Sequence, residues 1–207
     1  MYVPKHFDQP RLDEQLALAR AYPLATLVFQ GPDGLIANHI PLLSDATLSV
    51  LRGHVARANP LWRVIGAGLP ALAIFHGPQG YISPSLYPSK QFSGEVVPTW
   101  NYAVLHVHGQ LRAIDDAKWV RALVDTLTAQ HEAARPLPWQ LDDAPPAYAE
   151  RMLRGVVGIE LQVGRVVGKF KLSQNREAAD QAGVQQALAA TALGEFMAMS
   201  GTPPDAT

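Results

Sequence analysis

Polar and aromatic side chains that could hold a ligand are concentrated between residues 97 and 109, in the sequence VPTWNYAVLHVHG. Because successive side chains of a β-strand point to opposite faces, this stretch should have one polar and one apolar face. The polar face carries His106, His108 and Gln110, and the apolar face carries Leu105, Val107 and Leu111. The apolar face suits a core. The polar face and the aromatic residues before it suit a site for a polar aromatic ligand.

A second polar segment, GHVARANP over residues 53–60, follows an expected strand and contains Arg57 and Asn59. The backbone N–H groups and the guanidinium there would suit a phosphate. A capped turn with a solvated arginine explains the segment equally well. No G-x-G-x-x-G or P-loop pattern occurs, so a bound phosphate would be held by side chains such as Arg57 and Lys90.

Two further segments are rich in hydrogen-bonding groups. PSLYPSK, over residues 84–90, includes Ser85 and Lys90, and read alone it is typical of a rigid surface loop. GKFKLSQNR, over residues 168–176, places Lys169, Lys171 and Ser173 on one side of a strand. An edge strand protected by lysines and followed by an Asn175 helix cap explains part of it. The run of four hydrogen-bonding side chains at its end exceeds what capping needs.

Other chemistry is disfavoured by what the sequence lacks. His106 and His108 could share a metal, but no carboxylate lies near them in the sequence, and we expect no metal site. The sequence contains no G-x-S-x-G pattern, which would indicate a serine hydrolase. The chain has no cysteine and a net charge of −1, which excludes disulfides and a global basic field for nucleic acid. Direct DNA binding stays undecided.

Length and apolar patterning bound the organisation of the chain. The 207 residues are 48% hydrophobic, which predicts one domain over residues 1–200, with a disordered tail over 201–207. The chain shows neither an apolar signal region at its start nor an apolar run of roughly 18–20 residues. We therefore expect a cytoplasmic protein that does not insert into membranes.

The elements that must position these residues form an α+β fold, mainly antiparallel β. Strands are expected over residues 24–29, 35–43, 47–53, 71–76 continuing at 81–83, 99–114, 158–163 and 166–171. Helices are expected over 8–21, 115–134, 145–155 and from Asn175 onward, with a break at Gly183. No βαβ alternation is present, so the pattern favours a small antiparallel barrel with N-terminal, inserted and C-terminal helices.

Five segments, taken in order along nearly the whole chain, resemble the PaiB-like FMN-binding family. They are MYVPKHF (1–7), GHVARANP (53–60), the stretch from Gly77-Pro78 to YISPS (81–85), VPTWNY (97–102) and KFKLSQNR (169–176). The chain departs from the family at Leu86, where tryptophan is usual. The resemblance implies an FMN-binding split β-barrel that forms a homodimer, with flavin at the subunit interface. Members are described as negative transcriptional regulators of protease synthesis and sporulation.

The resemblance also implies roles for particular residues toward FMN. The isoalloxazine edge would be lined by Asn38, His39, Ile40 and Pro41. Arg57 and Lys90 are candidates for the phosphate, with Asn59 and Ser85 nearby. Thr99, Trp100 and Asn101 would reach the ribityl chain or the ring. Lys169, Ser173 and Gln174 would contribute from a second segment or from the partner subunit.

Three functions stay open at this point. In the first, FMN is a ligand or redox sensor of a transcriptional regulator. In the second, the protein is an FMN-dependent oxidoreductase that passes electrons from NAD(P)H to a small acceptor. In the third, which is less favoured, the protein binds or degrades haem, with His106 or His108 as an iron ligand. No helix-turn-helix with a basic recognition helix is apparent, which counts against direct regulation of DNA.

Overall fold

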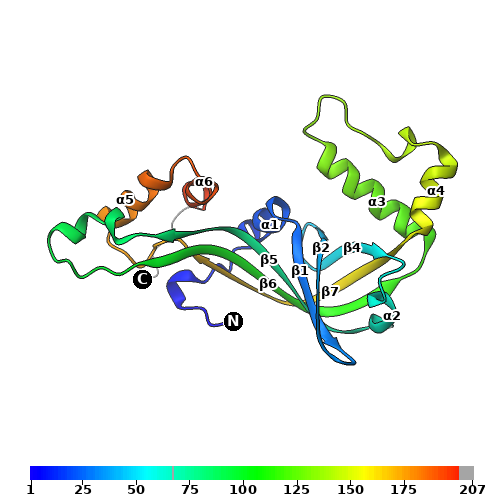
Figure 1. The fold of residues 1–207 in the computed structure, drawn as a ribbon, viewed down its shortest axis with the longest axis horizontal. Helices are drawn as coiled ribbons and strands as arrows, with labels where there is room; N and C mark the ends of the chain where they lie inside the picture. The colour runs from blue at the N-terminus through cyan, green and yellow to red at the C-terminus, as the bar shows by residue number, and fades with distance from the viewer. Residues whose placement is uncertain (67, 201–207) are drawn as a thin grey trace. The chain divides into compact units, whose positions relative to one another are not determined.

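The computed structural model describes residues 1–66 and 68–200, and these contain a seven-stranded sheet (Figure 1). Its strands are β1 (Leu24–Gly31), β2 (Gly34–Pro41), β3 (Leu43–Ser44), β4 (Val50–Ala56), β5 (Leu69–Ile82), β6 (Thr99–Ile114) and β7 (Val156–Lys171). Their order in the sheet is β2-β1-β5-β6-β7-β4-β3. β1 pairs antiparallel with β2 and β5, and β4 pairs antiparallel with β3 and β7. The mainly antiparallel fold predicted from the sequence is confirmed.

Helices precede, interrupt and follow the strands. They are α1 (Leu12–Ala21), α2 (Leu61–Ile65), α3 (Ala117–Glu132), α4 (Pro146–Arg154), α5 (Ala178–Leu188) and α6 (Ala192–Met199). Short 3₁₀ helices are η1 (Lys5–Phe7), η2 (Pro84–Leu86), η3 (Pro88–Gln91) and η4 (Leu141–Asp143). α3 begins where the Asp116 carboxylate accepts the backbone N–H of Trp119 at 2.7 Å, which caps the helix. Across residues 1–66 and 68–200, no helix combines the length and apolar character needed to cross a bilayer.

The chain divides into two compact units. The first unit comprises Met1–Ala21, His76–His106 and the described residues from Val167 onward, and the second comprises Tyr22–Phe75 and Val107–Val166. β5, β6 and β7 each contribute residues to both units. A single domain over residues 1–200 stays a prediction, and the tail predicted over 201–207 lies outside the described residues.

Alternating burial along the strands builds the core of the second unit. The β1–β2 hairpin runs from Leu24 opposite Pro41 to Gly31 opposite Gly34, as the turn residues between them predict. Within this unit the largest fully buried aliphatic side chains are Leu27, Leu51, Leu61, Leu111, Ile159 and Leu161. Burial of each such side chain contributes about 1.5–3 kcal/mol. In β1 and β4 burial alternates along the strand, whereas residues 157–161 of β7 are buried on both faces.

Several element boundaries differ from those predicted. β7 is one strand and not two, because Gly164 lies within it and forms no turn. α1 begins at Leu12 and not at Asp8, since Asp8 forms a β-bridge with Lys169. The N-cap of α5 is Glu177 and not Asn175. Gly183 lies inside α5, where a Cβ atom would be 2.4 Å from the carbonyl oxygen of Leu86, so it permits close packing and does not break the helix.

Candidate functional site

In the first unit, the start of β6 and the end of β7 bring together several predicted site residues. We define the β6–β7 cluster as Thr99, Trp100, Asn101, Lys169, Lys171 and Ser173. The two strands are neighbours in the sheet, and the antiparallel arrangement places the first residues of one beside the last residues of the other. Residues separated by about 70 positions in the sequence therefore share one site.

Lys171 connects the two strands of the cluster. Its ammonium group donates to the hydroxyl of Thr99 and to the carbonyl oxygen of Trp100, the latter at 2.9 Å. Burial lowers the pKa of Lys171, and the positive charges of Lys169 and Arg176 lower it further. A partly desolvated ammonium interacts strongly with any acceptor that approaches it. Lys171 was not among the predicted FMN ligands, although strand alternation had placed it beside Lys169.

Asn101 and Ser173 form a buried crosslink in the cluster. The side-chain amide of Asn101, which is fully buried, donates to the Ser173 hydroxyl at 2.8 Å. Its Oδ1 has no hydrogen-bond partner among the residues that the structure describes. Ser173, two residues after the end of β7, has a φ of 73°, a left-handed conformation that costs a non-glycine residue free energy. The polar pair therefore fixes the positions of Thr99, Trp100 and Lys171 from within the protein.

Gln174 continues this anchoring at the end of β7. Its Oε1 accepts the backbone N–H of Leu172 at 2.7 Å, and its Nε2 donates to the carbonyl of Phe170 at 2.6 Å. Both ends of its amide therefore bond the chain beside it. The structure gives Gln174 a backbone-supporting role, and its contact with flavin stays a prediction.

Aromatic rings and a second cation lie around the cluster. Trp100 is 49% exposed, its indole N–H donates to Gln79 Oε1 at 2.9 Å, and its ring lies 6.2 Å from that of Tyr81. The ammonium of Lys169 lies 5.4 Å from the ring of Tyr102. Flat aromatic surface next to ammonium donors is suited to a planar ligand with polar edges.

The predicted loop residues Ser85 and Lys90 also belong to the first unit. The Ser85 and Ser83 hydroxyls are 2.8 Å apart, and Lys90 is exposed in η3. η3 is attached to α5 by two hydrogen bonds. The buried carboxylate of Asp180 in α5 accepts hydrogen bonds from the backbone N–H of Ser89 at 3.1 Å and from the hydroxyl of Ser89 at 2.7 Å. The loop is thus held in a defined conformation.

Arg57, the predicted phosphate ligand of the second unit, is occupied by other groups. Its two Nη atoms donate to the two oxygens of Asp115 at 2.8 and 2.6 Å, and its Nε donates to the carbonyl of Arg154 at 2.8 Å. The Asp115 carboxylate raises the pKa of Arg57. This bidentate pair lies beside a cavity of about 440 Å³ that Arg121 and Glu150 also line. A phosphate would have to displace a carboxylate to reach Arg57, so its role toward FMN stays a prediction.

The predicted β2 residues do not share one face. Asn38 and Ile40 face the covered side of the strand, and His39 and Pro41 are exposed. Asn38 Oδ1 accepts from Asn59 Nδ2 at 3.0 Å, which joins β2 to the loop before α2. His39 Nδ1 lies 3.1 Å from the hydroxyl of Thr26. The side chains of the four residues do not all share one face of β2, and their contact with flavin stays a prediction.

The histidine pair is engaged with other groups. Nε2 of His108 lies 3.1 Å from a guanidinium nitrogen of Arg165, and burial is the main cause that lowers the pKa of His108. No group of three or more His, Asp or Glu residues that could hold a metal occurs in the part of the chain that the structure describes.

Comparison with known proteins agrees with this architecture. A family described as "Putative FMN-binding domain" matches residues 1–165. The Bacillus subtilis protein named "Protease synthase and sporulation protein PAI 2" is 33% identical over 190 residues, which cover 91% of this chain and 89% of that protein. The family match ends before Lys169, whereas the similarity to the Bacillus protein covers most of the chain.

Solved structures share the fold at low sequence identity. The flavocytochrome Anf3 from Azotobacter vinelandii matches with a TM-score of 0.62 and 11% identity, over 82% of this chain and 72% of that one. The FAD and heme binding protein from Mycobacterium smegmatis matches with a TM-score of 0.62 and 18% identity, over 84% and 78% of the two chains. The predicted split-barrel fold is thereby confirmed. The family match and the Bacillus relative show that the chain belongs to the PaiB-like FMN-binding family, whose cofactor is FMN.

Proposed function

We propose that the protein binds FMN at the β6–β7 cluster and uses the bound flavin as a ligand or redox sensor in a homodimeric regulator. The observation that carries this proposal is the Lys171 ammonium, which burial partly desolvates and which bonds Thr99 and the Trp100 carbonyl beside the exposed indole. Family membership supplies the cofactor. The geometry of the cluster supports this site for it.

The groups of the cluster match those of a flavin. FMN has a planar aromatic ring, a carbonyl-bearing edge and a hydroxylated chain, and when bound it supplies reversible electron transfer. The Trp100 indole would pack on the ring, and the Lys171 ammonium would donate to the carbonyl edge and favour negative charge there. Asn101 and Ser173 would hold both residues in place from beneath.

A second copy of the chain is part of this proposal. Tyr2, Tyr81 and Trp100 are exposed large aromatic residues of the first unit. Aromatic residues are enriched in protein interfaces, because they bury large areas with few rotatable bonds. A partner subunit that packs on these rings would also exclude water from a flavin bound between them.

Regulation is the proposed outcome of flavin binding, because the Bacillus relative is named for protease synthesis and sporulation. Direct DNA contact through the last two helices is disfavoured, since neither α5 nor α6 contains lysine or arginine. The chain is better suited to a mechanism in which flavin reduction changes the contacts within the dimer or the binding of a protein partner.

FMN titration of purified variants tests the site. We expect Lys171→Gln to weaken FMN binding at least tenfold, since a charge-assisted hydrogen bond contributes about 1.5–3 kcal/mol. Lys5→Gln, which removes an exposed lysine charge from the same unit, is the matched control and should leave the affinity unchanged. Equal affinities for both variants and the wild type would place the flavin elsewhere.

Trp100 has a matched control in Trp139, because their exposed fractions are 49% and 44%. Trp100→Ala should weaken FMN binding roughly three- to tenfold, the magnitude of an aromatic contact, and Trp139→Ala should not. Light scattering with and without FMN would test the homodimer. Multiple turnovers of NAD(P)H by the flavin-loaded protein with a small acceptor would favour the oxidoreductase function over a sensor.

A further inference from the structure

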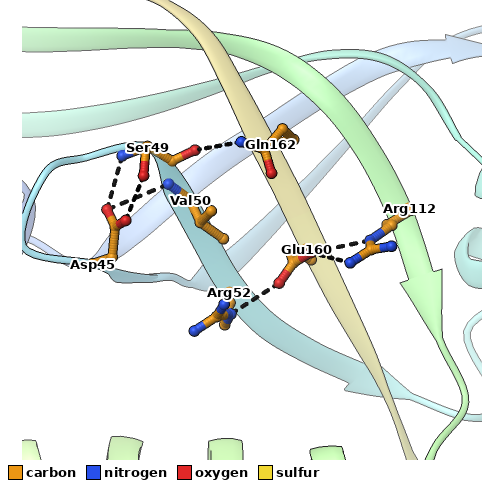
Figure 2. Close-up of polar contacts among 7 residues, drawn as sticks. All are labelled: Asp45, Ser49, Val50, Arg52, Arg112, Glu160 and Gln162. Carbon is orange, nitrogen blue, oxygen red and sulfur yellow. Dashed lines mark hydrogen bonds and ion pairs between the residues drawn. The ribbon is translucent and has the colours of Figure 1, made fainter.

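Three charged side chains form a cluster in the second unit that none of the functions above uses. Glu160 on β7 accepts from Arg52 Nε on β4 at 2.9 Å, and from Arg112 Nε and Nη2 on β6 at 3.0 and 2.6 Å. We call these three residues the Arg–Glu–Arg triad. β7 lies between β4 and β6 in the sheet, and Figure 2 shows Glu160 between the two arginines.

The strand register that aligns the triad is fixed by a turn. The Asp45 carboxylate accepts the backbone N–H groups of Ser49 and Val50 at 2.8 and 3.3 Å (Figure 2). The Ser49 carbonyl in turn accepts Gln162 Nε2 at 3.3 Å, which ties the start of β4 to β7. Arg52 is consequently paired with Glu160 across the two strands.

The carboxylate at the centre is buried, and the guanidinium groups on either side of it reach solvent. The exposed fraction of the Glu160 side chain is 6%, against 45% for Arg52 and 58% for Arg112. Burial alone would raise the pKa of Glu160, but the hydrogen bonds from Arg52 and Arg112 outweigh it and hold the pKa below its usual range. Glu160 is therefore ionised at neutral pH, and the triad carries a net charge of one positive unit.

The triad has donors left for a second anion. Within residues 1–66 and 68–200, Arg52 bonds Glu160 through Nε alone, and Arg112 through Nε and Nη2. Both Nη atoms of Arg52 and Nη1 of Arg112 therefore make no hydrogen bond to the described protein groups. Because one carboxylate orients both guanidinium planes, these donors are held in place before any ligand arrives.

We propose that Arg52 and Arg112 bind a phosphate group, with Glu160 as the residue that positions them. One arginine would suffice to neutralise Glu160, and the second brings uncompensated charge and planar donors to the surface. Guanidinium groups recognise phosphate through paired hydrogen bonds, and the negative charge of a phosphate is opposite in sign to the net charge of the triad. The phosphate belongs either to an FMN bound at the triad, in place of the β6–β7 cluster, or to a separate phosphorylated molecule.

Phosphate binding by the purified protein tests this proposal without flavin. A single substitution would leave a buried charge with fewer partners, so the informative variant is the triple change Arg52→Gln, Glu160→Gln and Arg112→Gln. It removes two positive charges and one negative charge, a net loss of one positive charge. Arg135→Gln causes the same net loss at an exposed helix-end pair with Glu132, and is the control. Thermal unfolding confirms that each variant is folded.

Inorganic phosphate should bind the wild type and Arg135→Gln in calorimetry at constant ionic strength. The triple variant should bind it at least tenfold more weakly. In a second arm, the ratio of riboflavin to FMN dissociation constants is compared between the wild type and the triple variant. A tenfold fall in this ratio assigns the triad to the phosphate of FMN. An unchanged ratio, with loss of inorganic phosphate binding, assigns it to a separate phosphate.

The proposal is overturned if the triple variant changes neither inorganic phosphate binding nor the riboflavin to FMN ratio. It is also overturned if Arg135→Gln reduces phosphate binding as much as the triple variant does, since net charge alone would then explain the effect. Because the first arm needs no flavin, its outcome is independent of FMN binding at the β6–β7 cluster.

Discussion

Asn101 and Ser173 should be energetically coupled through their hydrogen bond. A double-mutant cycle can measure this coupling energy. Replacement of Asn101 by alanine removes a hydrogen bond of 2.8 Å and leaves the buried Ser173 hydroxyl without a partner. The lost bond costs about 1 kcal/mol and the orphaned hydroxyl about 1–3 kcal/mol, so the free energy of unfolding should fall by roughly 2–4 kcal/mol. Ser173→Ala should cost a similar amount, because it leaves the Asn101 amide without its acceptor.

In the double variant neither orphaned group remains. Its cost should therefore be smaller than the sum of the two single costs by about 1–3 kcal/mol. The Asn101 Oδ1 atom, which lacks a partner among the described residues, is removed both in Asn101→Ala and in the double variant, so it does not change the coupling energy.

Urea unfolding of the wild type, both single variants and the double variant provides the four free energies. The slope with denaturant must agree among the four, since a changed slope signals a change in the denatured or native ensemble. A coupling energy below about 0.3 kcal/mol would refute the reasoning, because the two side chains would then act independently.

Two further predictions concern positions in the second unit. Burial lowers the pKa of His54 below its ordinary value of 6.5, so the unfolded chain takes up a proton first as the pH falls. Stability should therefore be complete above pH 6.5 and decline as the pH falls through that value toward the folded-state pKa. In urea unfolding between about pH 5 and 8, His54→Gln should flatten this decline, and parallel curves for the two proteins would contradict it. A Cβ atom at Gly109 would lie 2.1 Å from the Gln162 carbonyl oxygen, so Gly109→Ala should destabilise the fold by about 1–3 kcal/mol. A Cβ atom at Gly164 would have its nearest neighbour 3.9 Å away, so Gly164→Ala should lower the free energy of unfolding less than Gly109→Ala does in the same assay. Equal losses would exclude steric contact as the cause of the destabilisation.

Local patterns predicted the strands well where the pattern was unbroken. β6 begins at Thr99 and ends at Ile114, as alternation predicts, and the turn Gly31-Pro32-Asp33-Gly34 predicts the first hairpin. Glycines were harder to interpret, because the same residue serves turns and close contacts. The sequence predicts interruptions at Gly164 and Gly183, but both residues lie within regular elements.

The side-chain partners within the sites could not be predicted from local patterns. Arg57 pairs with Asp115, 58 positions away, and Arg52 shares Glu160 with Arg112. Pairings of this kind depend on which strands become neighbours, and alternation does not determine that order. One signal was present nonetheless: Glu160 is the sole charged residue between Gly155 and Gly164, a position that predicts a buried and paired carboxylate.

The continuity of β6 and β7 limits how the chain can vary in length. Each strand has 16 residues and carries polar residues near both ends. Because side chains alternate, deletion of a single residue near the middle of either strand would turn every later side chain to the opposite face. Such a deletion in β7 would bury the Lys171 ammonium in the core or shift Glu160 away from its arginines. Insertions and deletions should therefore be tolerated in the segment between α3 and α4 and be selected against within these two strands.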